Sequence, residues 1–206
     1  DLSPRLIEVM ASEDKVMEQL HLPVQSGSDR VLKAMRRGYT RAQYLAKVAD
    51  IRAKLPGVAL GSDFIVGFPG ESQEDFEASL SLLDEAGYDF LFSFKYSDRP
   101  FTKALKLIDK LPDHVKAARL DALQARQRDI SLALHQDMVG QVVEVLVEGP
   151  AKKGQGQLTG RCRTGQAVNF TGAPQMKGRL AQVRVTQGLV HSLKGRLIEL
   201  EEGASQ

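Results

Sequence analysis

The stretch Gly61-Ser-Asp-Phe-Ile-Val-Gly-Phe-Pro-Gly-Glu71 decides the fold of this 206-residue sequence. Its apolar run, 64–66, is long enough for a buried strand and too short for a helix. The glycines and the proline that follow predict a tight turn, and Ser72 with Asp75 three residues later is typical of a helix start. The stretch therefore predicts a strand, a glycine-rich turn and a helix. Turns in this position bind ligands in α/β proteins, although many of them are purely structural.

The same alternation of strand and helix occurs on both sides of this stretch. Further strands are predicted at 20–24, where Pro23 is expected to end the strand, and at 88–96. Helices are predicted over 4–11, 29–37, 40–55 and 72–86, the second of them stopped by Gly38. Such alternation predicts a parallel sheet.

Three strand–helix units do not close a barrel, and an open sheet edge is a template for pairing with another chain. A homo-oligomer could cover that edge, or the natural polypeptide could begin earlier. The absence of an initiator Met favours the second interpretation.

A second domain is predicted to follow residue 137. A long amphipathic helix, with Arg119, Arg126 and Arg128 on its outer side, is expected to join residues 1–137 to residues 138–206. Five β runs separated by glycine-rich turns predict a small five-stranded barrel in the second domain. The runs are 142–147, 156–162, 167–170, 180–185 and 195–200.

The composition excludes several classes of protein. No apolar run approaches the roughly 20 residues that a membrane-spanning helix needs. The single cysteine, Cys162, excludes an internal disulfide framework and favours a reducing compartment such as the cytoplasm. One thiolate cannot hold an iron–sulfur cluster, and His21 has no nearby His or Cys, so we predict no metal site.

The formal net charge of +2 is unevenly distributed. Residues 1–137 carry 19 basic and 21 acidic side chains, whereas residues 138–206 carry 9 and 5. A small basic module predicts a polyanion as partner, although solvated basic faces are also common.

Four motifs resemble those of the radical SAM methylthiotransferases and occur in the same order. They are His21-Leu-Pro-Val-Gln-Ser-Gly-Ser28, Arg36-Arg-Gly-Tyr-Thr40, Asp63-Phe-Ile-Val-Gly-Phe-Pro-Gly-Glu71 and Phe94-Lys-Tyr-Ser97. Residues 138–206 are similar to the TRAM module that ends those enzymes, through the motifs at 147–153, 156–163 and 168–170. The resemblance favours the branch that adds a methylthio group to carbon 2 of an isopentenylated adenosine beside the tRNA anticodon. The sister branch modifies a ribosomal protein.

The resemblance implies the C-terminal half of a parallel (β/α) barrel followed by a TRAM-like β-barrel that binds the anticodon region of tRNA. It also implies S-adenosylmethionine (SAM) and two 4Fe-4S clusters, whose cysteine ligands this chain lacks. We therefore expect the chain to be inactive by itself, and the sequence identifies no particular residue as catalytic. The alternatives are a fragment of the ribosomal-protein branch and a non-enzymatic RNA-binding adaptor.

The resemblance also implies roles for individual residues. Gln25 and Ser26 would contact the ribose or amino-acid part of SAM, or would only cap a turn. Asp63 would face the barrel lumen, or form a structural ion pair. Gly67 and Gly70 would let the backbone approach the adenine of SAM, or would only provide turn geometry. Tyr96 would line the cavity, or would be a core tyrosine.

The predicted RNA contacts all belong to the second domain. Five of them are cations expected to bind phosphates, and two could face a base, because aromatic rings stack on unpaired bases. The seven residues are Lys152, Lys153, Arg161, Arg163, Lys194, Asn169 and Phe170.

One loop departs from the family pattern. After its last strand the family commonly has Tyr-Ser-Pro-Arg-Pro-Gly-Thr-Pro-Ala, but this sequence has Asp98, Phe101 and Lys103 in place of a proline, the glycine and a proline. We expect a changed loop conformation and a different substrate side of the pocket.

Overall fold

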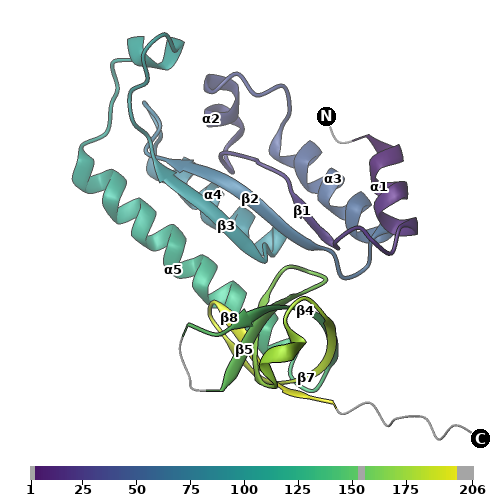
Figure 1. Ribbon diagram of the computed structural model, residues 1–206. Helices are drawn as coiled ribbons and strands as arrows, with labels where there is room; N and C mark the ends of the chain where they lie inside the picture. The colour runs from purple at the N-terminus through teal and green to yellow at the C-terminus, as the bar shows by residue number, and fades with distance from the viewer. Residues whose placement is uncertain (1–2, 153–155, 199–206) are drawn as a thin grey trace, which may run out of the picture. The chain divides into compact units, whose positions relative to one another are not determined.

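The computed structural model describes residues 3–152 and 156–198. The chain divides into two compact units between Ile130 and Ser131 (Figure 1). This division lies within the long helix α5 (Asp113–Asp137), whereas the sequence analysis placed the boundary at the end of that helix. No helix in the described part of the chain is long and apolar enough to cross a membrane.

The first unit contains a three-stranded parallel sheet in the order β1-β2-β3. Its strands are β1 (Gln19–His21), β2 (Ala59–Val66) and β3 (Phe90–Lys95). The helices are α1 (Pro4–Ser12), α2 (Asp29–Ala34), α3 (Arg41–Lys54) and α4 (Gln73–Ala86), and a short 3-10 turn, η1, covers Lys103–Lys106. The predicted parallel β/α arrangement is confirmed, with β1 ending before Pro23.

The two faces of this sheet differ sharply. Alternate residues of β2, Leu60, Phe64 and Val66, point into a core that α3, α4 and α5 complete. On the opposite face the paired strands place aromatic side chains in the open: Phe92 is 55% exposed and Phe94 is 54% exposed. In a closed barrel the uncovered face would line the interior.

Side chains cap the helices where the sequence predicts. Thr40 and Gln43 form a reciprocal capping box at the start of α3, and Ser72 and Asp75 form another at the start of α4. Both helices therefore begin at positions that local hydrogen bonding fixes.

The prediction that Gly38 ends α2 is wrong, because the helix already ends at Ala34 with Met35 as its C-cap. Arg36 takes the left-handed conformation, with φ of 61°. The Arg36 and Arg37 amides donate to carbonyls one turn back at 3.0 and 2.9 Å, the paired bonds of a Schellman motif. Glycine usually occupies this position, because a Cβ makes the left-handed conformation costly.

The second unit is a closed five-stranded barrel in the order β4-β5-β6-β8-β7, which confirms the predicted small all-β barrel. The strands are β4 (Val142–Pro150), β5 (Gln157–Cys162), β6 (Ala167–Thr171), β7 (Leu180–Leu189) and β8 (Ser192–Leu197), with a 3-10 turn η2 (Pro174–Met176). All pairs are antiparallel except β6 and β8, which are parallel. The last strand starts earlier than predicted, and residues 199–200 of that prediction lie outside the described residues.

Candidate functional site

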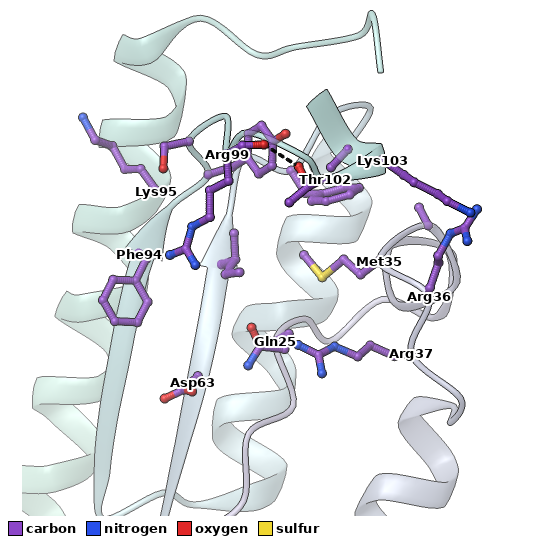
Figure 2. Close-up of a pocket in the computed structure, with 16 residues that line it drawn as sticks. Gln25, Met35, Arg36, Arg37, Asp63, Phe94, Lys95, Arg99, Thr102 and Lys103 are labelled. Atoms are coloured by element: carbon purple, nitrogen blue, oxygen red, sulfur yellow. Dashed lines mark hydrogen bonds between the residues drawn. The ribbon is translucent and has the colours of Figure 1, made fainter. Parts of the chain in front are cut away.

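A pocket of about 640 Å³ lies where the three parallel strands of the first unit end (Figure 2). Three of the six predicted cofactor contacts line it: Gln25, Asp63 and Tyr96. Its walls come from the loop after β1, from β2 and β3, from the end of α2 and from the loop after β3.

Gln25 reaches the pocket through an unusual backbone conformation. Its φ is 78°, and its main chain bridges to β2, with its amide donating to the Asp63 carbonyl at 2.8 Å and its carbonyl accepting from the Ile65 amide at 2.9 Å. These two bonds form one further bridge to β2, at Gln25, after the interruption at Pro23. They hold a left-handed glutamine, only 8% exposed, beside the ends of the strands.

Asp63 lies on the open face of the sheet. Its carboxylate is 2.9 Å from Nε2 of His21, and the Asp63 side chain is 27% exposed. The His21 ring stacks on Phe90, which covers Gly61; a Cβ at that glycine would lie 2.0 Å from the ring. Asp63 therefore contacts His21 of the neighbouring strand and also lies on the open face, where its carboxylate could accept a ligand hydrogen bond.

Tyr96 presents a protonated phenol. Its ring packs edge-on against Phe68 at 5.3 Å, and its hydroxyl donates to Asp98 at 3.0 Å. Burial raises the pKa of Tyr96, and the hydrogen bond to Asp98 raises it further. The side chain is consequently suited to hydrogen bonding and not to proton transfer near neutral pH.

The other three predicted cofactor contacts, Ser26, Gly67 and Gly70, do not line this pocket. Ser26 is fully buried, and its hydroxyl accepts from the Ser28 amide at 3.2 Å. Gly67 and Gly70 have φ of 71° and 78°, which the turn requires, and a Cβ on Gly67 would lie 2.3 Å from the Lys116 side chain. Gly67 and Gly70 thus form the turn after β2, and Ser26 belongs to the loop after β1.

Arg119 was predicted to face outward, and that prediction is wrong. The residue is 8% exposed and forms an ion pair with Glu71 at 2.5 Å, while its guanidinium lies 5.3 Å from the centre of the Phe76 ring. The same Glu71 carboxylate accepts from the Gly67 amide at 2.9 Å. The pair therefore ties the glycine-rich turn to α5, a tertiary link that periodicity along one helix does not reveal.

The pocket is strongly basic. Asp63 is the one acidic residue in its lining, whereas the basic residues there are Arg36, Arg37, Lys95, Arg99 and Lys103. Lys95 forms an ion pair with Asp113, with 3.0 Å between Nζ and the carboxylate oxygen.

The described residues include no group of three or more potential metal ligands. Cys162 is buried in the second unit, with its sulfur 3.1 Å from Oε1 of Gln166. These residues do not fit an iron–sulfur cluster. The pocket does fit SAM in size and chemistry, because cofactor sites typically occupy about 300–1,000 Å³ with a few polar groups.

In the second unit, three predicted RNA contacts share the outer face of adjacent strands. Arg161 on β5, Asn169 on β6 and Lys194 on β8 all point away from the core, and Asn169 is paired with Lys194. Arg161 is also bound locally, with its Nε 3.3 Å from Glu148.

The remaining predicted RNA contacts fall elsewhere. Lys152 is exposed in the loop after β4, Lys153 lies outside the described residues, and Arg163 lies beyond β5, 3.9 Å from Glu144. Phe170 is only 1% exposed, packed in the barrel core. A buried ring cannot stack on a base, so we withdraw Phe170 from the candidate interface.

The structure adds two cations that were not among the predicted contacts. Arg184 on β7 is paired with Arg196 on β8, and Arg196 is paired with Thr171 on β6, all with exposed side chains. We call Asn169, Thr171, Arg184, Lys194 and Arg196 the barrel surface. Strict alternation in 180–185 was the sequence signal that places Arg184 outward.

Comparison with known proteins agrees with these features. Residues 1–83 match the family profile of the radical SAM superfamily, and residues 136–198 match that of the TRAM domain. The tRNA-2-methylthio-N(6)-dimethylallyladenosine synthase of Methylococcus capsulatus is 46% identical over 198 residues, and that of Syntrophobacter fumaroxidans is 48% identical over 198 residues. Both alignments cover 96% of this chain and 43% of the relative, so the chain spans less than half of their length.

One solved structure has a similar fold, and because its sequence identity is low it supports the fold and nothing about function. The radical SAM enzyme coproporphyrinogen III oxidase (HemN) from Escherichia coli superposes with a TM-score of 0.53 at 15% identity, covering 97% of this chain and 49% of its own. In sequence, residues 1–83 match the radical SAM superfamily and residues 136–198 match the TRAM domain, in agreement with the resemblance of the sequence motifs.

Proposed function

We propose that this chain is part of a tRNA methylthiotransferase that adds a methylthio group to carbon 2 of an isopentenylated adenosine beside the anticodon. The observation that carries the proposal is the identity of 43–48% to synthases of this name over 96–99% of the chain, across both units. A cytoplasmic location, where tRNA is present, is part of the proposal.

In this proposal each unit has its own task. Gln25, Asp63 and Tyr96 hold SAM in the pocket of the first unit, and SAM supplies the reagent for the family's radical chemistry when it is bound. The barrel of the second unit binds the tRNA. Clusters of the 4Fe-4S type belong to the complete enzyme, because this chain has a single cysteine.

A domain exchange tests the proposal. The segment of the Methylococcus synthase that aligns with this chain is replaced by residues 1–206, and the chimera is expressed in a bacterial strain that lacks its own synthase. We expect the 2-methylthio nucleoside to return in digested tRNA, measured by liquid chromatography and mass spectrometry. The truncated synthase without the insert and this chain alone are the controls, and both should give none.

The outcomes separate the competing functions. Methylthiolation of a ribosomal protein, with no change in tRNA, would assign the chain to the sister branch. A chimera that folds and binds tRNA but modifies nothing would favour the non-enzymatic adaptor. Methylthiolation by the chain alone would contradict the expectation that it is inactive by itself.

A further inference from the structure

Four cations stand around the pocket of the first unit, and we call them the cationic rim: Arg36, Arg37, Arg99 and Lys103. Arg36 and Arg37 follow α2, whereas Arg99 and Lys103 belong to the loop after β3. Figure 2 shows Arg37 reaching toward Gln25 from one side and Arg99 pointing down beside Phe94 from the other. Two separate segments of the chain thus place positive charge around one opening.

This charge is not neutralised. None of the four rim side chains has an ion-pair partner within residues 3–152 and 156–198, in contrast to Lys95 and Lys110, which are paired with Asp113 and Asp98. A concave site with converging unpaired cations raises the local concentration of anions.

The backbone at Arg36 points to the same use. An arginine there keeps a left-handed conformation that glycine would adopt without strain, and its exposed side chain forms no ion pair or hydrogen bond within the described residues that could offset the cost.

The floor of the pocket is suited to a nucleoside. Phe94 lines the pocket with an exposed ring on which a base can stack, beside the residues proposed to hold SAM. Guanidinium groups bind phosphate oxygens through paired hydrogen bonds. We infer that the cationic rim binds the phosphodiester groups that flank the nucleotide entering the pocket, so that the first unit is a second RNA-binding surface besides the barrel. This inference rests on the proposed function, because it takes RNA as the ligand.

The test measures RNA binding by the 206-residue chain with a fluorescently labelled 17-nucleotide anticodon stem-loop. Arg37→Ala/Arg99→Ala is compared with a matched control, Arg5→Ala/Arg128→Ala, which removes two exposed arginines of the same unit that do not line the pocket. We expect the rim variant to lose about tenfold in affinity and the control to stay within about twofold. A second RNA carries uncharged methylphosphonate linkages on both sides of the target adenosine. On this RNA the rim variant should lose no more than about twofold.

Arg36→Gly provides a second variant, in which glycine suits the left-handed backbone at this position. It should raise the melting temperature while weakening RNA binding, since glycine relieves the strain and removes the cation. Equilibrium dialysis with SAM is run in parallel, because its carboxylate is another anion that the rim could bind.

Three results would overturn the inference: rim variants that bind RNA like the unaltered chain, an equal loss on both RNAs, or a loss of SAM binding with RNA binding intact. Absence of RNA binding by the unaltered chain would overturn both this inference and the proposed function. If the unaltered chain binds RNA and the rim substitutions do not change its affinity, this inference alone would be overturned.

Discussion

Asp75 connects the two loops that frame the strand ends of the first unit. Its carboxylate accepts from the Ser28 hydroxyl at 2.5 Å and from the Ser72 amide at 2.8 Å, and it forms an ion pair with Arg30. Burial alone would raise the pKa of Asp75, but hydrogen bonds from Arg30, Ser28 and Ser72 outweigh that effect and hold the pKa well below its usual range. The ionised side chain therefore stabilises the fold.

Replacing Asp75 by Asn should lower the free energy of unfolding at pH 7 by about 2 kcal/mol, since the charge-assisted bonds are lost. A depressed carboxyl pKa contributes stability above the unfolded pKa of about 3.9, and this contribution disappears as the pH falls toward the folded value. Denaturant unfolding from pH 7 to pH 2.5 should show the difference between the two proteins shrinking below pH 4. A constant difference over this range would contradict the assignment.

The buried ion pair of Glu71 and Arg119 is a second contact on which the stability of the fold depends. Burial raises the pKa of Glu71, against the lowering effects of the Gly67 amide and Arg119. Arg119→Met should cost about 3 kcal/mol or more, because it leaves a buried carboxylate without its cation. The raised pKa means that the folded state then holds a proton more tightly than the unfolded state, so the variant should regain stability as the pH falls.

The double variant Arg119→Met/Glu71→Leu serves as the control for this pair. It removes both charges and should recover most of the lost stability, because apolar replacements of buried pairs are often neutral. If the double variant is as unstable as Arg119→Met alone, packing of the Arg119 stem would be the cause, and not the uncompensated charge.

Among the elements, the loop after β3 carries a strain that the sequence comparison helps to explain. Phe101 occupies the position where the related family commonly has glycine, and it has φ of 66° with a fully exposed ring. A residue with a side chain thus holds a left-handed conformation in this loop.

Phe101→Gly should therefore raise the free energy of unfolding by about 1 kcal/mol, since it relieves the left-handed strain and removes no packing. Phe101→Ala is the matched control and should change little, because alanine pays the same steric cost. Thermal unfolding of the two variants separates strain from exposure of the ring. Equal melting temperatures for both would show that the loop is not strained.

Elements with local determinants were predictable. The N-caps Thr40 and Ser72 mark where their helices begin, and the strand before the glycine-rich turn ends in the apolar run 64–66. Arg119 was not predictable, because its partner Glu71 lies 48 positions earlier in the chain and nothing in α5 points to it. The left-handed Arg36 was missed for a related reason, since glycine two residues later is the commoner signal.

The candidate site residues also include some that the sequence placed correctly and one that it misplaced. Gln25, Asp63 and Tyr96 could be placed because side chains at the ends of parallel strands meet at one edge of the sheet. Phe170 was misplaced although the alternation with Val168 contained the answer, since both residues point inward.

For the whole molecule, a net charge of +2 conceals two distinct cationic surfaces, one in each unit. The barrel surface presents Arg184, Lys194 and Arg196 across neighbouring strands, and Arg184 is also held by a hydrogen bond to the Gly140 carbonyl at 3.0 Å. Phosphate contacts release counterions, so binding through such a surface depends steeply on salt.

Lys194→Ala/Arg196→Ala should therefore weaken binding of an anticodon stem-loop about tenfold at 150 mM salt and reduce the slope of log affinity against log salt by about 1.5. The matched control is Lys177→Ala/Arg179→Ala, which removes two exposed cations of the same unit outside the barrel surface. Fluorescence anisotropy at several salt concentrations gives both quantities, and unchanged melting temperatures confirm that the variants are folded. Equal slopes for the two double variants would show that the barrel attracts RNA through its general charge. A reduced slope in the first alone would place the phosphates on the outer face of β6, β8 and β7, because only contacts made in the complex release counterions there.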